Sequence, residues 1–161
     1  SIFSLDQSPR TLVKTKRKHF KSLFQNGHEF QLIDGVLELI KHYHKKGITL
    51  ILASSASMPN INMIFKKFGL DPYFKAKISG ADLKASKPHP EIFEKATELT
   101  GSSKNECVVI EDATNGIVAA KAAGLFCIAY NGGYSKNQDY SNADMVITNF
   151  EDIHLERLSI N

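Results

Sequence analysis

The sequence predicts an α/β protein with a mainly parallel sheet and helices on both of its faces. Short apolar runs of strand type alternate along the chain with longer segments whose apolar residues recur at helical spacing. Glycines follow most of the helical segments, as expected of helix C-caps. The length of 161 residues suits one domain with a real core. Strands that alternate with helices favour parallel pairing through right-handed crossovers.

The boundaries of the elements follow from apolar periodicity and from breaking residues. Ser8-Pro9 is typical of an N-cap followed by proline at the first helical position. The expected helices cover residues 8–25, 35–46, about 59–68, 91–100 and 114–123. The expected strands cover residues 48–53, 74–79, 107–111, 126–130 and 145–148. The apolar run 48–53 is typical of a strand that is buried on both faces.

Composition excludes several classes of function. The net charge of +3 is too small to make nucleic acid the main partner. The basic excess lies within residues 14–21 of a predicted helix, where a solvated face is the simplest interpretation, and no aromatic platform accompanies it. No apolar stretch is long enough to cross a bilayer. Cys107 and Cys127 fall in strand-like runs, which indicates free thiols, a reducing compartment and a cytoplasmic protein.

The stretch 108–120 organises the chain. An apolar strand ends in two adjacent carboxylates, Glu111 and Asp112, and an alanine-rich helix follows after a short turn. Two acids with no basic residue beside them in sequence are tolerated most easily around a hard divalent cation. The plainer interpretation is a strand that ends in solvent, with Asp112 beginning a turn. The residues alone leave these two interpretations about equally supported.

Two further features follow strands and suit phosphate. Ser54 and Ser55 follow the strand 48–53, and a hydroxyl with backbone N–H groups at a helix start can hold phosphate oxygens. Lys87 lies in the polar loop 80–90 and offers a point charge to the same oxygens. The alternatives are that the two serines cap the helix near Pro59 and that Lys87 is a solvated loop residue.

These three features resemble the motifs of the haloacid dehalogenase superfamily, in its β-phosphoglucomutase-like branch of phosphatases and mutases. The run 51–55 is similar to the family's second motif, a strand that ends in Ser or Thr. The run 86–93 resembles the third motif, and 109–116 the fourth, although the family often has Ser at the place of Ala113. The segment 143–147 is similar to the closing strand. The resemblance covers residues 35–153 with motif order and spacing in agreement.

The resemblance implies the roles of the site residues. Lys87 and Ser54 would be catalytic and bind phosphate together with Ser55, and Glu111 and Asp112 would hold Mg²⁺. The implied activity is magnesium-dependent phosphoryl transfer on a small phosphorylated metabolite, a sugar phosphate above all, through a phosphoaspartate. Phosphatase and mutase remain open alternatives.

The family's first motif, which carries the nucleophilic aspartate, has no convincing copy in the chain. The run 3–7 imitates it superficially, but Ser8-Pro9 begins a helix at once. We therefore expect residues 1–30 to be the C-terminal part of a helical cap, and residues 31–161 to be a core that lacks its first strand. A segment that precedes Ser1 would complete the sheet. A catalytically inactive binding domain is the alternative for a chain that is complete as given.

Overall fold

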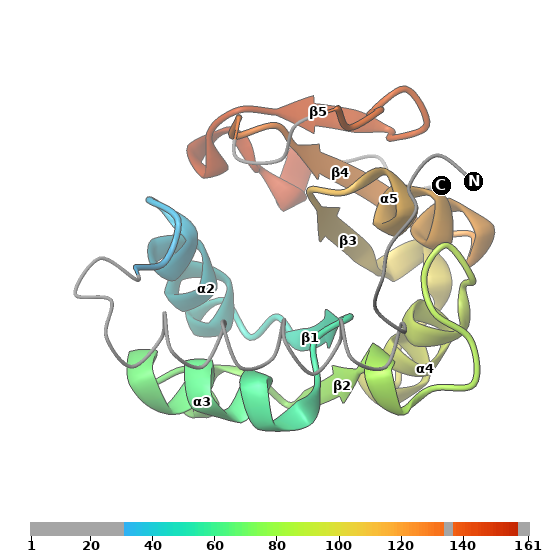
Figure 1. Cartoon of the computed structure of the whole chain (residues 1–161). Coiled ribbons are helices and arrows are strands. Elements are labelled where there is room, and N and C mark those ends of the chain that lie inside the picture. The colour runs from blue at the N-terminus through green and yellow to red at the C-terminus, as the bar shows by residue number, and fades with distance from the viewer. Residues whose placement is uncertain (1–30, 134–136, 158–161) are drawn as a thin grey trace. The chain divides into compact units, whose positions relative to one another are not determined.

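The strands form two separate parallel sheets in the part of the chain that the structure describes (Figure 1). The computed structural model describes residues 31–133 and 137–157. Residues Gly35–Asn161 cluster as one compact unit, whose fold is described here. The first sheet pairs β1 (Ile51–Ser54) with β2 (Ala76–Ser79). The second has the order β3 (Val108–Glu111), β4 (Phe126–Tyr130) and β5 (Met145–Ile147).

Four α-helices are described, as the sequence predicts; α2 precedes β1, and the other three connect successive strands from β1 to β4. They are α2 (Val36–Lys45), α3 (Met58–Phe68), α4 (Glu91–Thr100) and α5 (Thr114–Ala122). Gly69 and Gly101 end α3 and α4 in the left-handed conformation, with φ of 64° and 79°, because their backbone must turn out of the helix where a Cβ would be strained. All pairs among the described strands are parallel, so the predicted α/β class is confirmed.

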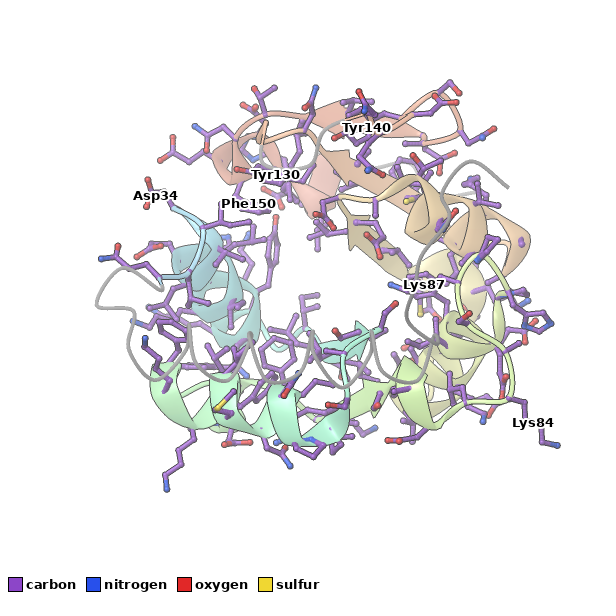
Figure 2. All side chains as sticks on the ribbon, viewed as in Figure 1. Asp34, Lys84, Lys87, Tyr130, Tyr140 and Phe150 are labelled. Carbon is purple, nitrogen blue, oxygen red and sulfur yellow. The ribbon has the colours of Figure 1, made fainter. Side chains whose placement is uncertain are left out.

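The larger sheet is covered on both faces because its side chains alternate along each strand. Cys127 and Ala129 pack with α4 and α5 in one apolar cluster. Ile128 and Tyr130 point to the other face, where they pack with Tyr43 of α2 and with the C-terminal segment. Tyr130 stacks on Phe150 at a centroid distance of 4.3 Å (Figure 2).

A hydroxyl anchors α2 to the C-terminal segment. The buried Tyr43 donates a hydrogen bond from its hydroxyl to the carbonyl of Ile153 at 2.8 Å. The same oxygen accepts a hydrogen bond from the backbone N–H of Leu155 at 3.1 Å. Both backbone groups are therefore satisfied by one side chain, which fixes the last described segment against the sheet.

Helix α4 joins the two sheets. Ile92 and Phe93 of this helix belong to one continuous core with Ile78 of β2 and with Val109 of β3. Helix α4 packs on β1 and β2 and also contacts α5, which covers β3 and β4. The carboxyl ends of β1 and β3 are therefore held by packing, although these two strands do not pair with each other.

The expectation for β1 was wrong in two respects. The strand covers Ile51–Ser54 and not 48–53, because the backbone N–H of Ile48 bonds to the carbonyl of Tyr43 at the end of α2. Every residue of β1 is partly exposed, where burial on both faces was expected. The reason is that β1 pairs on one side only among the described strands, so its second edge has no neighbouring strand to cover it.

Several predictions lie outside the described residues. They are the helix that begins at Ser8, the basic run 14–21 and the cap assigned to residues 1–30. Among the helices that are described, none combines the length and the apolar character that a bilayer span requires. The two cysteines are free thiols, as predicted, with Cys127 fully buried and Cys107 half-buried.

Candidate functional site

Lys87 enters the site from the loop between β2 and α4. Within this loop the N–H of His89 bonds to the carbonyl of Ser86 at 3.0 Å, and the N–H of Ala85 bonds to the carboxylate of Glu91 at 3.0 Å. The peptide bond that follows Lys87 is cis. Figure 2 shows Lys87 directed into the molecule, whereas Lys84 of the same loop points outward.

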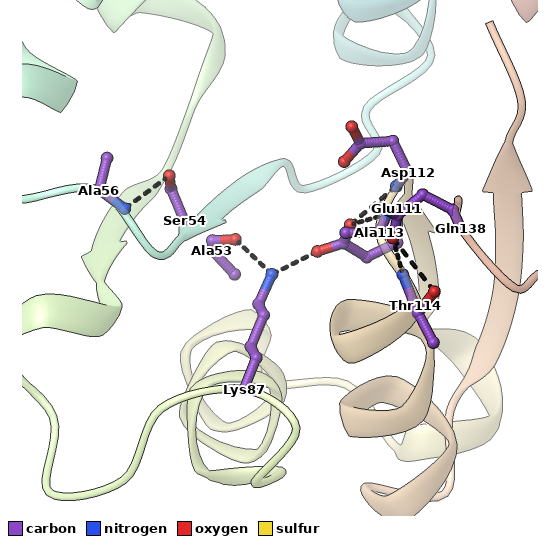
Figure 3. Close-up of polar contacts among 9 residues, drawn as sticks. All are labelled: Ala53, Ser54, Ala56, Lys87, Glu111, Asp112, Ala113, Thr114 and Gln138. Carbon is purple, nitrogen blue, oxygen red and sulfur yellow. Dashed lines mark hydrogen bonds and ion pairs between the residues drawn. The ribbon is translucent and has the colours of Figure 1, made fainter. Parts of the chain in front are cut away.

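The ammonium group of Lys87 joins the ends of the two sheets. Its Nζ lies 2.5 Å from Oε1 of Glu111, at the end of β3, and 3.3 Å from the carbonyl oxygen of Ala53 in β1 (Figure 3). It also lies 4.6 Å from the ring centroid of Phe93, a favourable place for a cation. The Lys87 and Glu111 side chains are only 10% and 11% exposed. The alternative of a solvated loop lysine is thus wrong for Lys87.

Both oxygens of the Glu111 carboxylate have donors. Oε1 accepts from Lys87, and Oε2 accepts from the backbone N–H groups of Asp112 at 2.7 Å and Ala113 at 3.1 Å. Burial raises the pKa of Glu111, but the Lys87 charge and these hydrogen bonds outweigh it, so the pKa lies below its ordinary value. Glu111 is therefore a buried, ionised carboxylate whose charge is balanced within the chain.

A glycine makes room for this carboxylate. Gly116 is buried in the first turn of α5, and a Cβ built there would overlap the carboxyl group of Glu111. The conformation of Gly116 is helical, so its requirement is one of space and not of backbone strain. The glycine in the motif 109–116 thus sets how closely α5 approaches Glu111.

Asp112 follows directly and is exposed. Its carboxylate and that of Glu111 are hard oxygen ligands, and Mg²⁺ is commonly held by one or two carboxylates together with substrate phosphate. The donor chemistry therefore fits Mg²⁺, with Asp112 accessible and Glu111 already engaged by Lys87. No cluster of three or more acidic, histidine or cysteine side chains with metal-binding geometry occurs among the described residues.

Ser54 ends β1 and Ser55 follows it, next to Ala53, whose carbonyl contacts Lys87. The hydroxyl of Ser54 accepts a hydrogen bond from the N–H of Ala56 at 3.2 Å, within its own turn (Figure 3). The alternative that Ser54 and Ser55 cap the following helix is wrong, because the N-cap of α3 is Ser57, which makes no side-chain cap bond. The structure brings Lys87 and Glu111 together directly and leaves the Ser54 hydroxyl at the carboxyl end of β1.

Two contributors were missed by sequence reasoning. Phe93 lies under the Lys87 ammonium, and the apolar spacing of α4 identified it only as a core residue. Gln138 accepts hydrogen bonds from the first residue of α5, Thr114. Its signal was indirect: Ala113 at the N-cap offers no side-chain oxygen, so the helix start needs an acceptor from elsewhere.

A family model described as haloacid dehalogenase-like hydrolase matches residues 2–130. The chain belongs to this family. The predicted family resemblance is confirmed, and so is the α/β fold that it implies. The match includes the runs that carry Ser54, Lys87 and Glu111.

Known members of the haloacid dehalogenase-like family match most of the chain. Protein CbbY of Cereibacter sphaeroides is 29% identical over 143 residues, which are 87% of this chain and 62% of CbbY. The β-phosphoglucomutase of Bacillus subtilis is 30% identical over 147 residues, which are 91% of this chain and 62% of that enzyme. The chain thus spans less than two thirds of the length of these two relatives.

A solved structure of CbbY from Rhodobacter sphaeroides in complex with phosphate has a TM-score of 0.81 to this chain at 29% identity. The superposition covers 93% of this chain and 69% of CbbY. A mutant of the same protein, in complex with xylulose-(1,5)bisphosphate, superposes equally well. The agreement in fold extends over nearly all of the chain.

Proposed function

We propose that this chain forms the larger part of a magnesium-dependent phosphoryl-transfer enzyme for a small phosphorylated metabolite, a sugar phosphate in the first place. The observation that carries the proposal is the Lys87 ammonium held between the carboxyl ends of β1 and β3, where it contacts the carboxylate of Glu111, the residue directly before Asp112. Ligands of open α/β sheets bind at this edge. The names of two relatives, β-phosphoglucomutase and the hexitol phosphatase A of Escherichia coli, which is 30% identical over 139 residues, support a phosphorylated sugar. So does the complex of CbbY with xylulose-(1,5)bisphosphate.

Each residue has a proposed role in the transfer. Lys87 neutralises the phosphoryl oxygens, with the Ser54 hydroxyl and the backbone of Ser55 as further donors. Asp112, with Glu111, holds Mg²⁺, which when bound neutralises charge on the transferring group. An aspartate carboxylate forms a bond to phosphorus as the ester bond breaks, and the departing oxygen takes a proton from a general acid. Water or a sugar hydroxyl then accepts the phosphoryl group.

We further propose a place for the nucleophile. Among the described strands, β1 and β3 each have one edge without a partner, and Ile110 of β3 is 40% exposed. Unpaired backbone groups cost about 1–3 kcal/mol each when buried, so a strand between β1 and β3 would stabilise both edges. Such a strand would deliver an aspartate next to Lys87. Residues 1–30 are proposed as the C-terminal part of a helical cap, and residues 31–161 as the core.

Titration with inorganic phosphate, in the presence and absence of Mg²⁺, tests the proposed site in this chain. Lys87→Met is expected to weaken phosphate binding by about 10- to 100-fold, the usual worth of a charge-assisted hydrogen bond. Lys84→Met removes an exposed lysine from the same loop and should leave the affinity unchanged. Asp112→Asn should remove the dependence on Mg²⁺. The proposal is contradicted if the two lysine variants lose phosphate affinity equally. It is also contradicted if phosphate affinity depends neither on Mg²⁺ nor on Lys87.

A second experiment separates catalysis from binding. Beryllium fluoride with Mg²⁺ forms an adduct only where a nucleophilic carboxylate is present, and ¹⁹F resonances report it. Bound phosphate without this adduct would favour an inactive binding domain. Incubation with β-glucose 1-phosphate separates the two reactions, since a phosphatase releases free phosphate and a mutase returns an isomerised sugar phosphate.

A further inference from the structure

The helix that follows the two carboxylates begins without a side-chain cap of its own. Ala113, the N-cap of α5, has an extended conformation with φ of −116° and ψ of 140°, and its methyl group accepts no hydrogen bond. The first N–H groups of a helix have no partner within the helix, so an acceptor has to come from a side chain, from water or from another segment. At α5 this position matters because Asp112 lies two residues before the first helical residue, Thr114.

Gln138 supplies the missing acceptor from the loop between β4 and β5. Its side-chain Oε1 accepts hydrogen bonds from the backbone N–H of Thr114 at 2.8 Å and from the Thr114 hydroxyl at 3.1 Å (Figure 3). The same hydroxyl accepts a hydrogen bond from the backbone N–H of Asp139 at 2.7 Å. Three hydrogen bonds therefore join this loop to the first residue of α5.

The start of α5 is in turn fixed against the Glu111 carboxylate. The N–H groups of Asp112 and Ala113 donate to Oε2 of Glu111, and Gly116 lies so close that a Cβ there would overlap the carboxyl group. A displacement of the first turn of α5 would therefore displace this carboxylate. The Lys87 ammonium, whose partner is Oε1 of Glu111, would lose its position with it.

We propose that Gln138 is a positioning residue: it caps α5 in place of a side chain at Ala113 and thereby holds the turn 111–113 in register with Lys87. The placement of the turn follows from hydrogen bonds within this chain. Its importance for metal and phosphate binding rests on the proposed function. Gln138 acts on the turn through its two hydrogen bonds to Thr114.

Amide hydrogen exchange, followed by NMR on the chain as it is, tests this proposal. Gln138→Met keeps the length of the side chain and removes its acceptor, and exchange at residues 112–116 should become about tenfold faster, since the loss of a cap shifts local opening by about that factor. Gln138→Glu keeps an acceptor oxygen and should retain protection. Ala113→Ser in the Gln138→Met background provides a new cap at the adjacent residue and should restore it.

Ser103→Ala is the matched control. Ser103 forms a capping box with Glu106 immediately before β3, so it lies at the end of this strand opposite to Asp112. Its loss should destabilise the chain without changing the amide proton shifts of Asp112 and Ala113, the two donors to Glu111. Those shifts should move in Gln138→Met. The proposal is overturned if exchange at 112–116 is unchanged in Gln138→Met, or if Ser103→Ala produces the same local pattern.

A Mg²⁺ titration of the same amide resonances keeps this inference distinct from the proposed function. In the wild type, Asp112 should respond to millimolar Mg²⁺, and Gln138→Met should require a several-fold higher concentration. If the Asp112 resonance of the wild type does not shift with Mg²⁺, the proposed metal site is contradicted. The hydrogen-exchange data would still test the positioning role of Gln138. Should Gln138→Met prove unstable, Thr114→Val provides a second test, because it removes two of the three hydrogen bonds between the loop and α5 and should also speed exchange at 112–116. Unchanged exchange in Thr114→Val would overturn the proposal.

Discussion

Lys87 and Glu111 form a nearly buried ion pair between two sheets that share no strand pairing. Nζ of Lys87 lies 2.5 Å from Oε1 of Glu111, and the same ammonium reaches the Ala53 carbonyl of β1 at 3.3 Å. A charge pair with side chains 10% and 11% exposed is costly to desolvate, so it stabilises the fold only while both partners are present. The pair lies at the sheet edge where the proposed function places the ligand, so the same two residues bear on the stability of the fold and on the proposed chemistry.

Removal of one partner should cost more than removal of both. Lys87→Met leaves the buried Glu111 carboxylate without its counter-ion and should lower the free energy of unfolding by about 3 kcal/mol. The double variant Lys87→Met/Glu111→Gln should recover a large part of this loss. Urea unfolding in a double-mutant cycle measures the coupling. Lys95→Met breaks the more exposed pair with Glu91 on α4 and should cost only about 0.5 kcal/mol. Additive effects of the Lys87 and Glu111 substitutions would contradict the interpretation.

Stability should depend on the ionisation of Glu111 at acidic pH. Burial raises the pKa of Glu111, but Lys87 and two backbone N–H groups lower it by more, so the net shift is downward from the ordinary value of 4.5. Glu111 therefore stays ionised in the folded chain at a pH where the same group in the unfolded chain binds a proton. The stabilisation is therefore complete above pH 4.5 and is lost as the pH falls through the lowered pKa. The difference in unfolding free energy between wild type and Glu111→Gln should shrink over that range.

A control for this pH dependence is Glu94→Gln, which alters an exposed carboxyl group on α4. It measures how far the substitution of an exposed carboxyl group by itself changes stability over the same acidic range. A Glu111→Gln difference that varies with pH no more than this control would show that the Lys87 contact does not control the ionisation of Glu111.

Gly116→Ala should be destabilising although the position is helical. Alanine in place of a helical glycine usually stabilises by about 1 kcal/mol, but here the new Cβ overlaps the Glu111 carboxyl group, and overpacking costs about 1–3 kcal/mol. In a Glu111→Ala background the overlap is removed, and the same substitution should become stabilising. Thermal unfolding of the wild type, the two single variants and the double variant measures both effects. Asn115→Ala, at the exposed neighbouring position, should be neutral or mildly stabilising. Destabilisation of equal size in both Glu111 backgrounds would refute the steric explanation.

The thiol of Cys127 should resist alkylation in the folded chain. Burial, together with the charges of Glu111 and Asp144, raises its pKa to about 12, and the side chain is fully buried. Iodoacetamide at mildly alkaline pH should therefore modify Cys107, which is half-buried, before Cys127. Mass spectrometry of peptides resolves the two sites, and unfolding in urea should make both reactive. Rapid native modification of Cys127 would show that this part of the core opens.

Local patterns were enough to predict the α/β class and most element boundaries. Helical spacing and the closing glycines at Gly69 and Gly101 act within one turn of chain, so they are readable from sequence. The end of a strand is also local, and parallel topology places such ends at one edge. For that reason the sequence by itself indicates Lys87, Glu111 and Asp112 as members of one site.

Only the tertiary structure decided how these groups are paired. The sequence predicts that the two acids share a cation, and the structure adds that Glu111 contacts Lys87, 24 residues away in sequence, while its second oxygen binds its own turn. The Ser54 hydroxyl remains within its own loop, and the acceptor at the start of α5 comes from Gln138. Such contacts depend on side-chain rotamers and on segments distant in sequence, whose approach is set by packing of the whole core and leaves no periodic signal in the chain.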